Sequence, residues 1–204
     1  MSKIIVIDPG HGRLQPGKRS PFFEYKGGNV YKGGNVQFEE WEFNRHVAEM
    51  LGHMLRKRRV KFLKTLPDTW NWDNHLAHSV GIINNLCDEY GANNVFFVSI
   101  HANAARGQGW SNASGVETLY YSAEQEAAIF QKHILDYLAP LGFKDRGIKQ
   151  RKGLYILKKT KCKGVITENG FYTNKEEVLH LMDGEVRYLI AEAHANAIME
   201  ILQI

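Results

Sequence analysis

The stretch Ile4-Ile5-Val6-Ile7-Asp8-Pro9-Gly10-His11-Gly12 decides the fold of this 204-residue chain. Its four consecutive β-favouring apolar residues predict a strand that is buried on both faces, and Asp-Pro-Gly ends that strand with residues typical of a turn. His11 therefore lies at the carboxyl end of a strand, where open α/β sheets bind their ligands. A single loop histidine is not a site, so the rest of the chain has to supply its partners.

Two further predicted strands end on residues that can do chemistry. The run Val95-Phe96-Phe97-Val98-Ser99-Ile100 is followed directly by His101, and the shorter run Val165-Ile166-Thr167 is followed by Glu168. If these strands are parallel neighbours, His11, His101 and Glu168 converge on one cleft. Two imidazoles and a carboxylate are a ligand set for zinc that leaves the fourth position open.

A second source of carboxylates lies just ahead of the first predicted helix, which covers about residues 42–58. Glu39 and Glu40 are both candidates for the third metal ligand. If the helix extends back by one turn, Glu40 falls on its apolar side and towards the core, but this geometric preference is weak. The residues alone leave the third ligand open between Glu39, Glu40 and Glu168.

Predicted strands alternate with predicted helices along the whole chain. This order indicates an α/β fold with an open, twisted, mostly parallel sheet and helices on both faces. With 204 residues, 44% of them hydrophobic, we expect one domain that spans residues 1–204. The expected helices cover about 42–58, 73–90, 123–138, 173–182 and 186–201, and the expected strands cover 4–7, 60–65, 95–100, 116–121, 154–157 and 165–167. Asp73 is the expected cap of the second helix, and Thr173 with Glu176 has the pattern of a capping box for the fourth.

Residues 13–38 show no sustained period and are expected to form a long surface loop. Within this loop, the hexapeptide Tyr25-Lys26-Gly27-Gly28-Asn29-Val30 is repeated at once as residues 31–36. A tandem copy of six residues is far too short for a repeat architecture, and an exposed loop tolerates such a duplication. The functional alternative is a lid over the site or a segment that contacts the substrate.

Positive charge is concentrated in one part of the chain. The formal net charge is +4, but the window from Lys144 to Lys163 holds nine Lys and Arg residues against one acid, Asp145. This asymmetry favours a polyanionic partner such as an anionic polymer of the cell envelope, and a solvated basic face is the alternative. We expect no nucleic-acid partner, because no motif with interleaved aromatic residues accompanies the window.

The start of the chain and its cysteines indicate where the protein is made. Met1-Ser2-Lys3 leads straight into the first strand, and no apolar run approaches the ~18 residues of a membrane span. We expect a soluble protein that is synthesised in the cytoplasm without a signal peptide or a transmembrane segment. Cys87 and Cys162 are too few for a disulfide framework or a thiolate zinc site.

Five motifs, in order along the chain, carry a resemblance to a known family. They are Ile5–Gly12, Glu40-x-x-Phe43-Asn44, Ser99-Ile100-His101-Ala102-Asn103, Gly115-Val116-Glu117 and Thr167-Glu168-Asn169-Gly170-Phe171. Together they resemble the zinc-dependent N-acetylmuramoyl-L-alanine amidases of the Amidase_3 type. The resemblance runs from Ile4 to about Met182 and implies an open, mostly parallel α/β sheet.

Carried over position by position, the resemblance implies that His11, Glu40 and His101 bind one zinc ion and that Glu168 is the catalytic carboxylate. It thereby implies Glu40 rather than Glu39 as the third ligand. The implied reaction is hydrolysis of the amide bond between the lactyl group of N-acetylmuramic acid and L-alanine in peptidoglycan. In this reaction Glu168 would take a proton from the attacking water and give it to the departing amine.

Two further residues are candidates for binding the substrate. Asn103 lies two residues after a proposed ligand, where it can orient the substrate or the ligand. Arg146 matches a family arginine before Gly-Ile-Lys and is expected to meet a carboxylate of the peptide. The alternatives are a loop hydrogen bond for Asn103 and a solvated charge for Arg146. Glu117 alternates along a predicted strand, so we expect it to be structural.

The implied partners are the peptidoglycan stem peptide and N-acetylmuramic acid. A single domain without an export signal favours a bacteriolytic enzyme such as a phage endolysin, which reaches the wall after host lysis proteins open the membrane. A bacterial enzyme acting on its own wall and a domain of a longer chain are alternatives. Two other classes of function remain open: a different zinc peptidase or deacetylase with the same ligands, and a non-catalytic module that binds the cell wall.

Overall fold

A six-stranded sheet forms the centre of the computed structural model, which describes residues 3–67, 75–107 and 109–204. The strands are β1 (Ile4–Pro9), β4 (Phe62–Lys64), β5 (Val95–Asn103), β6 (Val116–Tyr120), β7 (Asp145–Gln150) and β8 (Lys163–Phe171). Their order across the sheet is β4-β1-β5-β8-β6-β7. The first four of these are parallel, whereas β6 runs antiparallel to β8 and parallel to β7. The predicted mostly parallel α/β sheet is confirmed.

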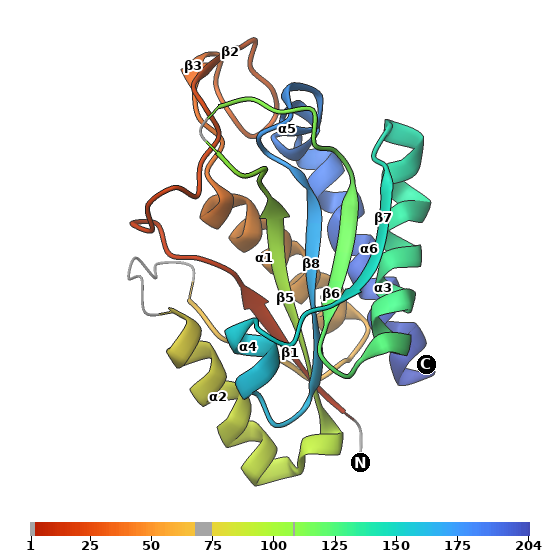
Figure 1. Cartoon of the computed structure of the whole chain (residues 1–204). Helices are drawn as coiled ribbons and strands as arrows, with labels where there is room; N and C mark the ends of the chain where they lie inside the picture. The colour runs from red at the N-terminus through yellow and green to blue at the C-terminus, as the bar shows by residue number, and fades with distance from the viewer. Residues whose placement is uncertain (1–2, 68–74, 108) are drawn as a thin grey trace.

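Helices cover both faces of this sheet, as Figure 1 shows. They are α1 (Glu40–Lys57), α2 (His75–Tyr90), α3 (Glu124–Leu138), α4 (Tyr155–Lys159), α5 (Lys175–Leu181) and α6 (Gly184–Leu202), with short 3-10 turns at Ala92–Asn94 and Ala139–Leu141. The larger core packs α1, α3 and α6 on one face, and the smaller core packs α2 and α4 on the other. Within the described part of the chain, none of these helices has the length and apolar character needed to cross a bilayer.

The alternation of side chains along β1 feeds both cores. Ile5 and Ile7 point into the larger core, whereas Val6 points into the smaller one. All three are fully buried. The continuous apolar run at the start of the chain therefore forms a strand with both faces covered, as the sequence predicts.

Helix α1 packs along the sheet through one apolar stripe and carries Glu40 at its first position. Phe43, Val47, Leu51 and Leu55 recur every four residues and are fully buried, so one side of the helix faces the core. The helix begins at Glu40, two residues before the predicted start at about residue 42, so it extends back far enough to include Glu40.

Two predictions about the 144–163 window are wrong. Residues 154–157, predicted as a strand, are instead the cap and the first three residues of the short helix α4, because a brief apolar run does not distinguish a strand from a buried helical turn. Strand β7 at Asp145–Gln150 is absent from the prediction. It is an edge strand whose residues are exposed or half-buried, so its sequence lacks the apolar alternation of a covered strand.

The 13–38 segment is not a loop throughout, which corrects the prediction. It contains an antiparallel pair of short strands, β2 (Phe23–Tyr25) and β3 (Gly34–Val36). The first repeat copy begins at the end of β2 and forms the turn, whereas the second copy ends in β3. Tyr31, at the start of the second copy, packs its ring 5.3 Å from the guanidinium carbon of Arg187 in α6. The duplicated hexapeptide thus ties this hairpin to the body of the domain.

The start of α5 differs from the predicted capping. At α5 the cap is Asn174 rather than Thr173, because the Asn174 side-chain oxygen accepts the backbone N–H groups of Glu176 (2.9 Å) and Glu177 (3.2 Å). The Thr173 hydroxyl instead accepts a backbone N–H from the loop after β5. The predicted cap of α2, Asp73, lies outside the described residues.

Candidate metal centre

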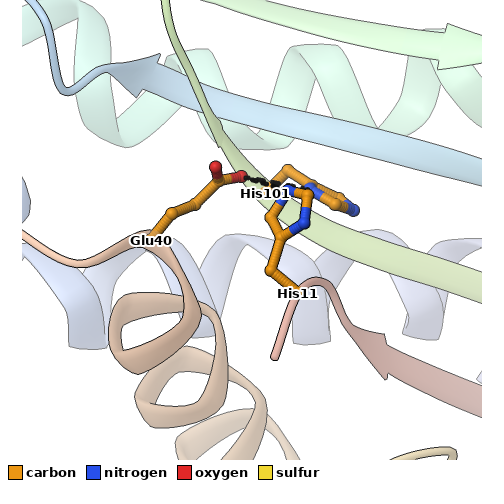
Figure 2. A group of neighbouring side chains, drawn as sticks. All are labelled: His11, Glu40 and His101. Carbon is orange, nitrogen blue, oxygen red and sulfur yellow. Dashed lines mark hydrogen bonds and ion pairs between the residues drawn. The ribbon is translucent and has the colours of Figure 1, made fainter. Parts of the chain in front are cut away.

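Three side chains from three separate elements meet at the carboxyl edge of the sheet (Figure 2). His11 follows β1, Glu40 begins α1, and His101 lies near the end of β5. His11 Nε2 lies 3.2 Å from Glu40 Oε1 and 3.2 Å from His101 Nδ1, and His101 Nδ1 lies 3.1 Å from Glu40 Oε1. Neighbouring ligands of a tetrahedral zinc ion are roughly 3.3 Å apart when its bonds are about 2.0–2.1 Å long. The three donor atoms therefore have the separations that one zinc ion requires.

Hydrogen bonds to residues other than these three ligands determine which nitrogen of each imidazole carries the proton. His11 Nδ1 donates to Gln15 Oε1 at 2.6 Å, because an amide oxygen can only accept. His101 contacts Ser99 Oγ through Nε2 at 3.1 Å, so its Nδ1 faces Glu40. Two nitrogen lone pairs and a carboxylate oxygen then point at one place. Such a donor set repels itself unless a cation lies between the atoms, and it fits zinc.

The turn after β1 brings the two histidines together. A Cβ atom on Gly10 would lie 2.1 Å from Cε1 of His101, so the His101 ring can pack there only because residue 10 has no side chain. Asn44 holds the same turn, donating from Nδ2 to the Gly10 carbonyl at 2.9 Å. His11 itself adopts φ 67°, a backbone conformation that L-residues rarely adopt and that tends to persist at functional sites.

Glu40 is almost fully buried, with 1% of its surface exposed. Burial alone raises the pKa of Glu40, but when the two imidazoles are protonated and no cation is bound, their charges and hydrogen bonds outweigh burial and hold that pKa well below its usual range. Glu40 therefore stays ionised and offers a negative oxygen to a cation. Glu39 points elsewhere, pairing with Arg19 at 3.3 Å and accepting the Trp41 indole N–H at 2.6 Å.

Glu168 lies on β8 directly opposite His101 on β5. The pKa of Glu168 is raised to about 8, mainly by burial and secondly by the negative charge of Glu40, although the positive charge of Lys18 lowers it. Among the described residues, Glu168 Oε2 is buried without a hydrogen-bond partner. Glu168 is not part of the candidate metal group: among the described residues, the potential ligand atoms that lie within 4.8 Å of one another belong to His11, Glu40 and His101. Glu168 thus lies beside the candidate ligands with one buried carboxylate oxygen unpaired within the described part of the chain.

The two candidate substrate-binding residues lie on strands on either side of β8: Asn103 on its neighbour β5, and Arg146 on the edge strand β7, beyond β6. Asn103 ends β5, and its side-chain oxygen accepts the backbone N–H of the next residue at 2.8 Å. Arg146 donates from Nε to Glu117 Oε2 at 2.8 Å, and its guanidinium carbon lies 4.8 Å from the centre of the Phe171 ring. Glu117 pairs in register with Glu168 across β6 and β8. Its ion pairs fit the structural role predicted for Glu117.

Three residues that touch the ligands were not identified from the sequence. Gln15 and Lys18 lie in the loop after β1, and Lys18 Nζ is 3.9 Å from Glu40 Oε2. No periodic pattern predicts where such loop side chains lie. Ser99 lies two residues before His101 in β5, so both point to the same face of the strand. That period of two was the signal that could have identified Ser99.

Comparison with known proteins gives the family. A family model for N-acetylmuramoyl-L-alanine amidases, Amidase_3, matches residues 5–200. An endolysin of Bacillus phage SPP1 is 35% identical over 115 residues, which cover 53% of this chain and 40% of the endolysin. The N-acetylmuramoyl-L-alanine amidase CwlM of Bacillus licheniformis is 29% identical over 196 residues, which cover 95% of this chain and 66% of CwlM. The chain thus matches less than two thirds of the length of either relative.

Solved structures have the same fold over nearly the whole chain. The N-acetylmuramoyl-L-alanine amidase AmiC2 of Nostoc punctiforme superposes with a TM-score of 0.76 at 25% identity, covering 99% of this chain and 98% of AmiC2. The catalytic domain of CwlV from Bacillus (Paenibacillus) polymyxa var. colistinus gives a TM-score of 0.71 at 26% identity, covering 99% of both chains. Since the family model covers almost all of the sequence, this chain belongs to the Amidase_3 family of N-acetylmuramoyl-L-alanine amidases.

Proposed function

We propose that this chain hydrolyses the amide bond between the lactyl group of N-acetylmuramic acid and L-alanine in peptidoglycan. The observation that carries the proposal is the convergence of His11, Glu40 and His101, whose donor atoms lie 3.1–3.2 Å apart. Family membership supports the choice of substrate. We further propose that these three residues hold one zinc ion and that residues 1–204 act as a single catalytic domain.

Each part of the site has a distinct task in this reaction. Zinc held by the three ligands would polarise the scissile carbonyl and lower the pKa of water there towards ~7. Glu168 accepts the proton that the attacking water loses and delivers it to the nitrogen of L-alanine as the C–N bond breaks. The unpartnered Oε2 of Glu168 supports this role. In the metal-free protein the pKa of Glu168 is raised to about 8, and a carboxyl group that titrates near the working pH suits a role in which it must both accept and return a proton.

Asn103 and Arg146 are proposed to position the substrate. Arg146 uses Nε for Glu117 at 2.8 Å and Nη1 for the Ser114 carbonyl at 3.3 Å, and its side chain is 34% exposed. Its remaining nitrogen, Nη2, is therefore available for a carboxylate of the stem peptide. Asn103 fixes the start of the loop after β5 through its side-chain oxygen, which leaves its amide NH₂ group for a carbonyl of the substrate.

The basic window is proposed to hold anionic polymers of the cell wall. Several of its cations are neutralised within the fold, for example Lys161 by Asp88 at 2.5 Å and Lys163 by Glu126 at 2.8 Å. Four exposed cations form what we call the α4 basic surface: Arg151, Lys152, Lys158 and Lys159. Contacts between exposed charges are screened by salt, so wall binding should weaken as ionic strength rises. Binding that does not change with salt would contradict this contact.

We also propose that the chain acts as a lytic enzyme at the bacterial wall, with a phage endolysin as the favoured biological role. The match to the endolysin of Bacillus phage SPP1 supports this role, although it covers only part of both chains. An endolysin would reach the wall after host lysis proteins open the membrane. This lytic role is tested by permeabilising the membranes of bacterial cells, adding the protein from outside and measuring lysis, which is the expected result.

Digestion of purified peptidoglycan tests the reaction directly. The products are treated with an amine-labelling reagent and hydrolysed, so that labelled residues identify the new amino ends. New amino ends on L-alanine, with no increase in reducing sugars, are expected. New ends at other peptide positions would support a peptidase, new free amines on the sugars would support a deacetylase, and binding without any new ends would support a non-catalytic module. A sample treated with chelator is the control for metal dependence.

A further inference from the structure

Asp8 forms a buried polar cluster next to the metal centre. It lies in β1 and is 1% exposed. Asp8 Oδ1 accepts hydrogen bonds from Thr65 Oγ1 and Ser79 Oγ, both at 2.6 Å, and Asp8 Oδ2 accepts one from Ser99 Oγ at 2.5 Å. The three hydroxyl-bearing residues are at most 2% exposed. These four residues are called the Asp8 cluster below.

A carboxylate is an unexpected choice at this position. Asp8 follows Val6 by two residues, so its side chain points to the face where Val6 packs in the smaller core under α2. Burying a carboxylate costs free energy, and replacing a buried polar group together with its hydrogen-bond partners by apolar groups of similar shape can be nearly neutral or stabilising. Stability alone therefore does not explain Asp8. A second reason for a carboxylate here is that Ser99, which bonds to Asp8, also contacts the candidate ligand His101.

The direction of each hydrogen bond in the cluster follows from chemistry. An ionised carboxylate can only accept, so the Ser99 hydroxyl gives its one proton to Asp8. Ser99 Oγ then has only lone pairs for His101 Nε2, which lies 3.1 Å away and must donate to it. A neutral imidazole carries one N–H. The proton on Nε2 leaves a lone pair on Nδ1, the atom that faces His11 and Glu40.

We propose that Asp8 is a positioning residue that acts through Ser99 to fix the tautomer and the ring orientation of His101. The inference rests on the proposed zinc amidase function and extends it to residues that do not touch the ion. Asp8 orients the Ser99 hydroxyl, Ser99 accepts from His101 Nε2, and Nδ1 of His101 is held ready as a ligand. Partners of this kind behind a ligating histidine typically contribute 10–100-fold to metal affinity.

Two variants break this connection at different points. Ser99→Ala removes the acceptor of His101 Nε2, and Asp8→Asn removes the charge that orients Ser99. The matched control is Ser79→Ala, which also removes a buried hydroxyl bonded to Asp8 but leaves the bond between Ser99 and His101 in place. Urea unfolding of the chelator-treated proteins measures the loss of stability in each. If Asp8→Asn does not fold, Ser99→Ala decides the question.

The zinc dissociation constant, measured by competition with a chromophoric chelator, is the main measurement. Ser99→Ala and Asp8→Asn should raise it about 10–100-fold, whereas Ser79→Ala should leave it within about twofold of the unaltered chain even if its stability falls. Nitrogen-15 NMR of the metal-free proteins gives a second measurement. In the unaltered chain it should show the His101 proton on Nε2. In Ser99→Ala it should show two neutral tautomers in exchange, with the single ring proton on either Nε2 or Nδ1.

The outcomes separate this inference from the proposed function. A folded Ser99→Ala variant with unchanged zinc affinity and an unchanged His101 tautomer would overturn the role of Asp8, whatever reaction the enzyme performs. An unaltered chain that binds zinc with the expected dependence on Ser99, but releases no amino ends on L-alanine, would contradict the amidase function and leave the role of Asp8 intact. An unaltered chain that binds no zinc would contradict both.

Discussion

His101 and Glu168 occupy paired positions on the neighbouring parallel strands β5 and β8. One is a proposed metal ligand and the other the proposed proton acceptor, so the register of the sheet itself places the base beside the metal centre. Side chains on neighbouring strands are held more precisely than side chains on loops. The distance between ligand and base is therefore a property of the core, and it is maintained by the same apolar residues that form the sheet.

The first prediction concerns Glu168. Glu168→Gln keeps the shape of the side chain but removes its capacity to accept a proton, so the rate of amide hydrolysis should fall about 10²–10⁴-fold. Zinc content, measured by elemental analysis, should stay at one ion per chain because Glu168 is not one of the three proposed ligands. Glu49→Gln, on the exposed side of α1, is the control and should keep full activity. Unchanged turnover in Glu168→Gln would remove Glu168 from the mechanism.

The second prediction is a dependence of stability on pH in the chelator-treated protein. The pKa of Glu168 is raised from its ordinary value of 4.5 to about 8, so between these values the folded state holds a proton that the unfolded state has lost. The free energy of unfolding should therefore fall as pH rises, by at most about 1.4 kcal/mol per pH unit. His194, whose burial lowers its pKa from 6.5 to about 4, gives the opposite slope below pH 6.5. The window from about pH 6.5 to 8 isolates Glu168.

Urea unfolding at several pH values in that window checks this sign. The metal-free unaltered chain should lose stability towards pH 8, and Glu168→Gln should lose distinctly less, because its neutral amide does not titrate. Parallel curves for the two proteins would show that Glu168 does not carry a raised pKa.

The third prediction concerns Gly10. Gly10→Ala would place a Cβ atom 2.1 Å from Cε1 of His101, so the imidazole has to move away from the other ligands. Zinc affinity should fall by at least about tenfold, by analogy with loss of a residue that orients a ligand. Gly81→Ala, in α2, meets nothing within 4 Å and should raise stability by up to about 1 kcal/mol while leaving zinc binding unchanged. Equal zinc affinities in both variants would contradict the packing of His101 on Gly10.

The fourth prediction concerns Arg187, which joins α6 to α1. Its guanidinium is fully buried and bonds both oxygens of Glu42, at 2.8 and 3.0 Å, and the Leu181 carbonyl at 2.7 Å. Arg187→Met leaves Glu42 without this partner, and the free energy of unfolding should fall by about 3 kcal/mol, the lower end for a broken buried pair because Glu42 is partly exposed.

Urea unfolding measures that loss against a matched variant. Lys132→Met breaks an exposed pair with Asp136, which lies 3.3 Å away, and should change the free energy of unfolding by less than about 1 kcal/mol. If the two variants differ by less than that, the Arg187 pair contributes no more than a surface contact.

Most of the sheet could be predicted from the sequence, because β1, β5 and β8 are covered on both faces and their apolar runs are dense. The direction of β6 could not, since the alternation of buried side chains is the same in parallel and antiparallel strands. The direction of β6 depends on the loop after β5. This loop enters β6 from the end of the sheet at which the chain leaves β5, so the two strands run in opposite directions. Strand β7 was missed because an exposed edge strand does not need an apolar pattern.

The candidate site was predictable where it is attached to strands and less so elsewhere. His11, His101 and Glu168 follow from the rule that parallel strands end at one edge of a sheet. For Glu40, helical geometry gave only a weak preference and the family resemblance decided. Gln15 touches the site from a loop, and its position depends on tertiary packing that no local pattern encodes.

The central claim is that one zinc ion is held by His11, Glu40 and His101. Anomalous X-ray diffraction at the zinc absorption edge, from crystals of the zinc-loaded protein, tests it most directly. The account predicts a single strong peak about 2.0–2.2 Å from His11 Nε2, His101 Nδ1 and a carboxylate oxygen of Glu40. A zinc-loaded crystal with no peak among these atoms, or with the ion bound by other side chains, would contradict it.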